Sequence, residues 1–146
     1  MPLYIIAALV MIVLDQVVKY WALTSLQAQH TIPLIENVFH LTYVENRGAA
    51  FSLLAQFDSR WIFVALAVII TIVIFIVLRI DYIQTALGRW SLVLVAAGAL
   101  GNAIDRVIHG FVVDLFDFRL IHFPVFNVAD IFICVGGVLF VIYFMF

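Results

Sequence analysis

Residues 61–80 read WIFVALAVIITIVIFIVLRI, an apolar stretch in which Arg79 is the only ionisable side chain. A helix needs about 20 mostly apolar residues to cross the hydrocarbon core of a bilayer. Three further windows, residues 3–23, 88–108 and 125–146, meet the same length requirement. The sequence therefore predicts an all-α membrane protein built as a bundle of four transmembrane helices.

The composition of the whole chain excludes the main alternatives. Of its 146 residues, 67% are hydrophobic and only 11% are charged. A soluble fold of this size leaves too much surface in water to hide that apolar content, and a disordered chain needs the opposite balance. The formal net charge of −2 provides no basic surface for nucleic acid. We therefore expect one integral membrane domain over residues 1–146, with no nucleic-acid partner.

The connections between the predicted spans are unequal in length and in pattern. Residues 32–44 (IPLIENVFHLTYV) are rich in β-branched and aromatic side chains, and residues 38–44 alternate in the manner of a strand. The first connection therefore predicts a small β-sheet at the membrane interface. The connection from residue 109 to residue 124 is intermediate in length.

The basic residues suggest an orientation for the bundle. Arg79 and Arg89 flank the tight second connection, which the positive-inside rule assigns to the cytoplasm. Both termini are then cytoplasmic, and the sheet is extracytoplasmic. The first span lacks a basic leading region and contains Asp15 and Lys19, so we expect it to be retained rather than cleaved as a signal peptide.

Ionisable and amide side chains gather at the edges of the predicted spans, where they are costly. Each has a plain structural explanation. Asp15 and Lys19, four residues apart, fit an i, i+4 ion pair that eases insertion about as well as they fit a functional role. Asn127 and Asp130 have the spacing of a helix N-cap. Cys134, the single cysteine, is expected to be a buried packing thiol.

These separate explanations do not account for the clustering. If the third and fourth spans are antiparallel neighbours, their ends bring Asp105, Arg106, Asp114, Asn127 and Asp130 to one corner of the bundle. Two carboxylates close to an apolar phase can share one proton, so that one acts as a general base on water and the other as an acid toward a carbonyl. The four histidines lack metal-ligand spacing, and we expect neither a metal nor a cofactor.

Five blocks of this sequence resemble, in order and spacing, the lipoprotein signal peptidase family, also called signal peptidase II. The resemblance extends from Asp15 to Asp130 and through the last span, which is nearly the whole chain. The blocks are DQVVK (15–19), ENRGAAF (45–51), GALGNAIDR (98–106), VVD (112–114) and FPVFNVAD (123–130).

The resemblance implies an aspartic endopeptidase of the bacterial inner membrane, acting on prolipoproteins among the membrane lipids. Such enzymes cut the signal peptide just before a cysteine that already carries a diacylglyceryl group. By motif, the catalytic pair is Asp114 and Asp130. The resemblance assigns substrate binding to Asn46, Gly48, Asn102, Arg106 and Asn127, and supporting roles to Asp15, Lys19 and Asp105. A monomer with an extracytoplasmic active site is expected.

One departure from the family pattern leaves a choice open. Leu115 separates Asp114 from the phenylalanine that commonly follows it, and Asp117 adds a second carboxylate nearby. Either aspartate could therefore pair with Asp130, although Asp117 and Arg119 are expected to face water. Among other classes, a transporter would show repeats or broken helices, and a presenilin-type protease would carry a Gly-x-Gly-Asp tetrapeptide; the sequence has neither.

Overall fold

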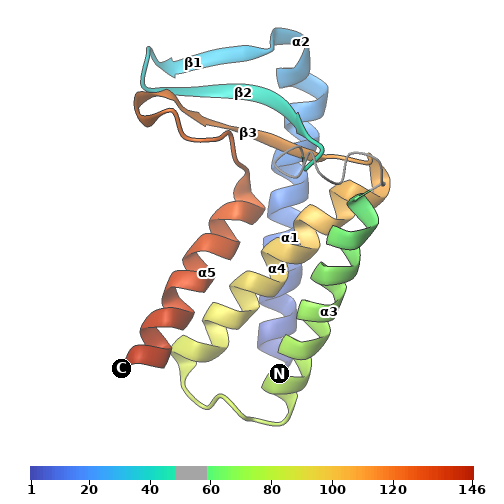
Figure 1. Cartoon of the computed structure of the whole chain (residues 1–146), viewed down its shortest axis with the longest axis vertical. Helices are drawn as coiled ribbons and strands as arrows, with labels where there is room; N and C mark the ends of the chain where they lie inside the picture. The colour runs from blue at the N-terminus through green and yellow to red at the C-terminus, as the bar shows by residue number, and fades with distance from the viewer. Residues whose placement is uncertain (49–58) are drawn as a thin grey trace.

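Four long helices form the body of the protein in the computed structural model, which describes residues 1–48 and 59–146 (Figure 1). They are α1 (Pro2–Trp21), α3 (Arg60–Arg79), α4 (Ala86–Ile108) and α5 (Val128–Met145). All four are long and apolar enough to span a membrane, which confirms the expected fold class. Ala49, Ala50 and Phe51 of the second sequence block lie outside the described residues.

Two helix boundaries differ from the sequence windows for local reasons. The first helix does not stop at residue 23, because α1 continues through a π-helical turn, η1 (Ala22–Leu26), into the short α2 (Gln27–Gln29). The last helix begins at Val128 rather than at residue 125, because Asn127 caps its N-terminus. The first helical segment therefore reaches past the bundle to the sheet.

A three-stranded antiparallel sheet lies at one end of the bundle. Its strands are β1 (Thr31–Ile35), β2 (Phe39–Asn46) and β3 (Val112–Phe118), in the order β1-β2-β3. The first two strands confirm the strand pattern of residues 32–44. The third strand was not predicted, although the run of β-branched and aromatic side chains in VVDLFDF is typical of a strand. A short helical turn, η3 (Arg119–Ile121), follows it.

A β-bulge interrupts the pairing of β2 with β3. Leu41 pairs with Phe116, but Val44 pairs with Asp114, so β2 contains one residue more than β3 over this interval. Because side chains alternate faces along a strand, the extra residue shifts the rest of β2 to the opposite face. The alternation predicted through Val44 is therefore broken. Asn46 consequently lies on the same face of the sheet as Asp114.

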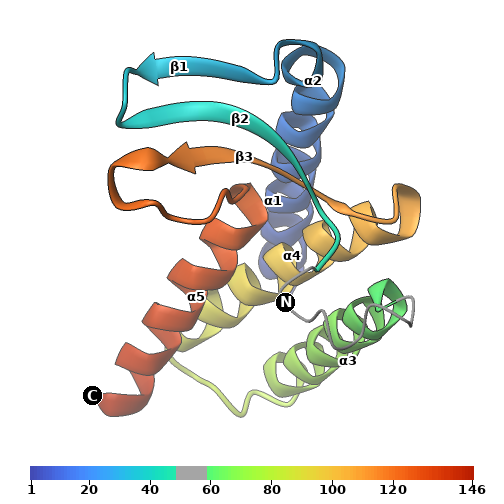
Figure 2. The same cartoon turned by 45° about the horizontal axis from the view of Figure 1, so that its top comes forward.

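The helix α4 is the central element of the bundle. Half of its span is buried, whereas the other three spans are mostly exposed, as expected of helices that face lipid. Figure 1 shows α4 between α3 and α5, and Figure 2 shows the sheet above the bundle, over α1 and the start of α5. Small residues of α4 permit these close contacts: a side chain at Gly98 would meet Ala129 of α5, and one at Gly101 would meet Asp15 of α1.

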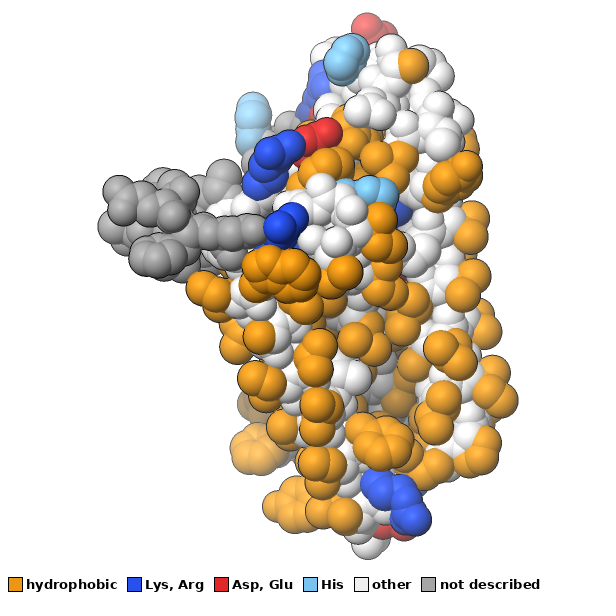
Figure 3. Space-filling view, turned by 90° about the vertical axis from the view of Figure 1, so that its right-hand side faces the viewer, with side chains coloured by type: hydrophobic (Ala, Val, Ile, Leu, Met, Phe, Trp, Pro, Cys, Tyr) orange, Lys and Arg blue, Asp and Glu red, His pale blue; other side chains and the backbone are white. Residues whose placement is uncertain are grey.

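The polar residues lie at the two ends of the molecule. Figure 3 shows apolar side chains covering the helical body, with charged side chains near the sheet and at the opposite end. Both termini lie at the end opposite the sheet, as does the connection between α3 and α4 (Figure 1). The protein is therefore a multi-pass membrane protein with its sheet and its termini at opposite ends of the helical body.

Adjacent glycines in α5 provide a test of this packing. A Cβ at Gly136 would lie 2.6 Å from the Ser91 carbonyl oxygen of α4, whereas a Cβ at Gly137 would meet nothing within 4 Å. We expect Gly136→Ala to destabilise the bundle by about 1–3 kcal/mol, as over-packing does. The matched Gly137→Ala should be neutral or slightly stabilising. Thermal unfolding in one detergent compares them, and equal shifts in Tm would contradict this packing of α4 against α5.

Candidate active site

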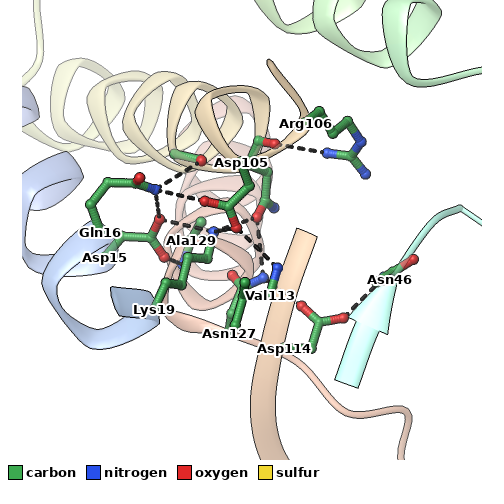
Figure 4. Close-up of polar contacts among 12 residues, drawn as sticks. Asp15, Gln16, Lys19, Asn46, Asp105, Arg106, Val113, Asp114, Asn127 and Ala129 are labelled. Atoms are coloured by element: carbon green, nitrogen blue, oxygen red, sulfur yellow. Dashed lines mark hydrogen bonds and ion pairs between the residues drawn. The ribbon is translucent and has the colours of Figure 1, made fainter. Parts of the chain in front are cut away.

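The expected site residues meet where β3, the end of α4 and the start of α5 converge. Asp114 lies on β3, Asn102 on α4 and Asp130 in the first turn of α5. Figure 4 shows Asp114 facing Asn46 of β2, with Asn127 on its other side. Residues distant in sequence therefore form one polar cluster at the boundary between the bundle and the sheet.

Asp130 is held in place by the cap of α5. Its Oδ2 accepts a hydrogen bond from the Asn127 main-chain N–H at 3.1 Å, and its own N–H donates to Asn127 Oδ1 at 2.9 Å. This reciprocal pair is a capping box, which satisfies main-chain donors that a helix start leaves open. The N-cap explanation given from the sequence is thus confirmed. It leaves the Oδ1 atom of Asp130 available to other partners.

Asp114 is nearly inaccessible to solvent, at 2% exposure, and receives two amide donors. Asn46 Nδ2 donates to its Oδ2 at 3.0 Å, and Asn127 Nδ2 donates to its Oδ1 at 2.6 Å. Asn46 is oriented in turn by Gly48, whose N–H donates to Asn46 Oδ1 at 2.9 Å. Gly48 adopts a φ of +77°, a conformation that favours glycine.

Two asparagines join the carboxylates to each other. Asn127 Nδ2 donates to both Asp114 and the Oδ1 of Asn102, the latter at 3.1 Å. Asn102 Nδ2 then donates to Asp130 Oδ1 at 2.8 Å. Each carboxylate therefore faces an amide N–H, and the two amides bond to each other. This continuous chain of hydrogen bonds fixes the pair relative to one another.

Burial makes the carboxyl group of Asp114 a weaker acid than that of an ordinary aspartate. Removal from water, together with the nearby charge of Asp130, raises the pKa of Asp114 to about 6, although the bonds from Asn46 and Asn127 act in the opposite direction. A carboxyl group with this pKa retains a proton much closer to neutral pH than an ordinary aspartate does. Asp114 can therefore serve as the protonated member of a carboxyl pair.

Arg106 supplies positive charge beside the two carboxylates. Its Nη1 donates to the Asn102 main-chain oxygen at 3.2 Å, and its guanidinium lies 4.8 Å from the centre of the Phe63 ring. In Figure 4 its side chain lies on the side of the cluster away from Asp15 and Lys19. The fork of donors on an arginine suits carbonyl and carboxylate oxygens.

A second polar cluster packs against the first and supports it. Lys19 is buried and bonds to Asp15 at 2.9 Å, to Asp105 at 3.1 Å and to Asn102 Oδ1 at 2.9 Å. The structure therefore shows the expected ion pair, extended to α4. Sequence reasoning missed Gln16, whose Nε2 donates to Asp15, Asp105 and the Gly101 carbonyl oxygen. A glutamine beside Asp15 in an apolar span was the available signal.

Asp117 lies apart from this arrangement. Its carboxylate accepts bonds from Thr42 at 2.7 Å and Arg119 at 2.8 Å. Partial burial raises its pKa, but the bonds from Arg119 and Thr42 outweigh this effect and lower the pKa below its usual value. Arg119 is 43% exposed as expected, but Asp117 is only 13% exposed because of these partners. The geometry favours Asp114 as the partner of Asp130.

An apolar groove opens beside Asp130. It has a volume of about 530 Å³, and Asn46 and Asp130 form its polar end. Phe126, Ile131, Cys134 and Val135 contribute to its apolar wall, which follows α5 into the bundle's span. Cys134 is exposed in this groove, so the expectation of a buried packing thiol is wrong. The groove therefore connects the apolar face of α5 with Asp130.

This is a four-helix membrane protein in which hydrogen bonds through two asparagine side chains connect two carboxylates beside a lipid-facing groove. These are the features of a membrane-embedded acid–base hydrolase. The chain belongs to the signal peptidase II family: the family model described as signal peptidase (SPase) II matches residues 7–146. The protein is accordingly a protease of this family.

Relatives and solved structures agree with this assignment. The chain is 50% identical to a lipoprotein signal peptidase of Clostridioides difficile (strain 630), over 99% of this chain and 95% of that protein. It is 47% identical to one of Brevibacillus brevis, over 91% and 87%. A structure described as a bacterial membrane enzyme at 1.9 Å resolution superposes with a TM-score of 0.89 at 31% identity, over 99% of this chain and 93% of that chain.

Because the pKa of Asp114 is raised in the folded protein, replacing Asp114 should change how the stability of the protein depends on pH. As pH rises from 3.8 to about 6, the unfolded chain ionises at this residue before the folded one. Folding stability therefore falls over this range, by on the order of 3 kcal/mol, and the loss persists at higher pH. Asp114→Asn removes this penalty, so its Tm relative to the unmodified protein should rise from pH 4 to pH 7.

Asp117→Asn is the matched control. Because the pKa of Asp117 is lowered on folding, its carboxylate stabilises the protein above the ordinary aspartate pKa and loses this effect as pH falls. The Tm of this variant relative to the unmodified protein should therefore stay nearly constant from pH 4 to pH 7 and rise only as pH falls below 4. A pH-independent difference for Asp114→Asn would contradict the raised pKa.

Proposed function

We propose that this protein removes the signal peptide from diacylglyceryl-modified prolipoproteins by cutting just before the lipidated cysteine, with Asp114 and Asp130 as the catalytic pair. The observation that carries this proposal is the chain of hydrogen bonds from Asp114 through Asn127 and Asn102 to Asp130. The names of the relatives, lipoprotein signal peptidase, supply the substrate class.

The two carboxylates differ in environment, which supports different roles. Asp114 is buried and has a raised pKa, so it donates its proton to the carbonyl oxygen of the scissile bond. Asp130 lies at the groove and takes a proton from water, whose oxygen adds to the carbonyl carbon. When the C–N bond breaks, the proton on Asp130 passes to the leaving nitrogen and Asp114 recovers its own.

The remaining polar residues divide between holding the pair and holding the substrate. Asn127 uses both amide hydrogens on Asn102 and Asp114, so we assign it to positioning the carboxylates. Arg106, together with Asn46, Gly48 and Asn102, is proposed to bind the extended peptide, whose main-chain groups need partners in a site of low polarity. Asp15, Lys19 and Asp105 keep the supporting role described above.

The groove along α5 suits a substrate that is already in the bilayer. We propose that the lipid-modified segment enters from the membrane along the wall that contains Phe126 and Cys134. We also propose that the sheet and the carboxylates lie on the extracytoplasmic side of the bacterial inner membrane, with both termini in the cytoplasm. A monomer is proposed as the active unit.

Amide variants of the carboxylates test the catalytic pair. Asp114→Asn and Asp130→Asn should each abolish cleavage of a lipidated prolipoprotein in detergent, because each removes one member of the proton-sharing pair. The double variant should be no worse than either single variant, since the two residues act as one unit. Cleavage should persist with a chelator present.

Asp117→Asn is the control for this experiment and should retain cleavage, because Asp117 bonds to Thr42 and Arg119 instead. Near-normal cleavage by Asp114→Asn, together with loss in Asp117→Asn, would show that the pair has been misassigned.

The role of the lipid requires a separate comparison. The acyl chains remain in a hydrocarbon environment before and after docking, so their burial adds little net affinity. Their effect is to place the modified cysteine and its preceding peptide bond against Asp114 and Asp130. We expect an unlipidated precursor, at equal density in the same liposomes, to be cut far more slowly in single turnover. Equal rates would show that the lipid does not position the bond.

A further inference from the structure

Lys19 occupies a position that the mechanism above does not explain. Its ammonium lies 2% exposed among three acceptors: Asp15 at 2.9 Å, Asp105 at 3.1 Å and Asn102 Oδ1 at 2.9 Å. An ammonium has three N–H donors and no acceptor, so these three contacts use its whole capacity. Its two carboxylate partners already suffice to neutralise one charge. The third contact, to an uncharged amide, satisfies the remaining N–H donor and connects Lys19 to Asn102.

The contact with Asn102 determines which way this amide points. An asparagine side chain carries an oxygen acceptor at one position and a donor at the other. Because Lys19 can only donate, it requires the oxygen of Asn102, and the Nδ2 group must then face Asp130. The same oxygen accepts from Asn127 Nδ2, which directs the donors of both amides toward the carboxylates.

The carboxylates could not hold this orientation through a reaction. An ionised Asp130 requires a donor from Asn102, but once it takes up a proton it can itself donate, and it would then accept either face of the amide. Lys19 requires the oxygen of Asn102 at every stage. A fixed reference for the amide direction therefore comes from groups that do not exchange a proton with the substrate. These groups are Lys19 and the amide of Asn127, which the Asp130 main-chain N–H orients in turn.

The other partners of Lys19 reach the main chain beside each carboxylate. Asp15 Oδ1 accepts from the N–H of Ala129, the residue before Asp130, at 2.9 Å. Asp105 Oδ2 accepts from the N–H of Val113, the residue before Asp114, at 3.0 Å. Lys19 thus connects, through one carboxylate each, to the backbone at both members of the pair, and through Asn102 to the amide bridge between them.

We propose that Lys19 is a positioning residue for the reaction: it fixes the donor direction of Asn102 and the main-chain placement of Asp114 and Asp130. This rests on the proposed function, in which those two aspartates react with the substrate. The alternative is that Lys19 serves only as an ion pair that stabilises α1 in the bundle. The two possibilities predict different effects on the orientation of the Asn102 amide when the cluster is altered without a change in its net charge.

The test uses a variant that conserves the formal charge of the cluster. Lys19, Asp15 and Asp105 together carry −1, and the double variant Asp15→Asn/Lys19→Met also carries −1 because one cation and one anion are removed together. The amide introduced at position 15 retains an oxygen that can accept from Ala129. The matched control is Gln16→Met, which removes bonds to Asp15, Asp105 and Gly101 but does not touch Asn102.

Side-chain amide NMR reports on Asn102 without any need for activity. The chain contains four asparagines, at positions 37, 46, 102 and 127, so [15N]asparagine labelling gives a simple spectrum. The Asn102 resonance is identified by its loss in Asn102→Asp. We expect its amide proton to be shifted downfield by the carboxylate of Asp130, to move upfield in the double variant, and to keep its position in Gln16→Met and in Lys19→Arg.

Kinetics with the lipidated precursor provide the second readout. The double variant should lose about 10- to 100-fold in kcat, the range expected when a reacting group is displaced by about 1 Å. Gln16→Met should lower Tm but reduce kcat less than the double variant does, because it leaves the contact between Lys19 and Asn102 in place. Lys19→Arg, which also only donates, should recover most of kcat. Absence of cleavage by the unmodified protein would overturn the proposed function, while the NMR comparison would still decide the role of Lys19.

Two results would overturn the proposal. One is a double variant with an unchanged Asn102 resonance and unchanged kcat at a lowered Tm, which indicates an ion pair alone. The other is an equal response of Asn102 in Gln16→Met, which indicates general loosening of the cluster. If the double variant does not fold, Lys19→Gln replaces it. Glutamine can present either a donor or an acceptor to Asn102, so the Asn102 resonance should shift or split. An unchanged resonance would refute the proposal.

Discussion

The constraint on which the structure depends is the cost of placing ions inside a membrane bundle. A buried charge is tolerated only when it is paired and its remaining hydrogen-bonding positions are filled. Lys19 meets this requirement with partners from α1 and α4, and the two carboxylates it binds accept further N–H groups from α5 and β3. One buried ammonium thus specifies the relative placement of four elements. The helices, which expose mainly apolar surface to lipid, gain little such specificity from hydrophobic burial between themselves.

Helix capping and the proposed catalysis use the same residues in this protein. Asn127 caps α5 and also bridges the two carboxylates, while Asp130 completes the cap with one oxygen and faces Asn102 with the other. From sequence, the cap and the catalytic role looked like competing explanations of these residues. In the structure they are compatible, because a helix start is rigid and its side chains have fixed directions. A carboxylate mounted there is positioned with little further loss of conformational freedom.

The sequence predicted the features that depend on composition and on local spacing. The four spans follow from the length of the apolar stretches, and the first two strands follow from period-two alternation. The clustering of polar residues near the ends of α4 and α5 follows from the free-energy cost of placing charge in lipid. The third strand was missed because its partner strand, β2, lies far away in the sequence, so no hairpin pattern marks it. Gln16 was missed because its three acceptors come from two different helices. Cys134 was misplaced because depth along a helix does not determine which face meets the groove.

The bulge in β2 limits how the chain length can vary. The one additional residue between Leu41 and Val44 sets which face of the sheet Asn46 occupies, since Thr42 before it bonds to Asp117 and Asn46 after it bonds to Asp114. A single-residue deletion within this interval would turn Asn46 to the wrong face while leaving both strands paired. Insertions in the turn between β1 and β2 carry no such penalty, because that turn lies before the bulge. Among natural variants of this protein, length differences should therefore accumulate in the hairpin turn and be absent from the segment that runs from the bulge to Asn46.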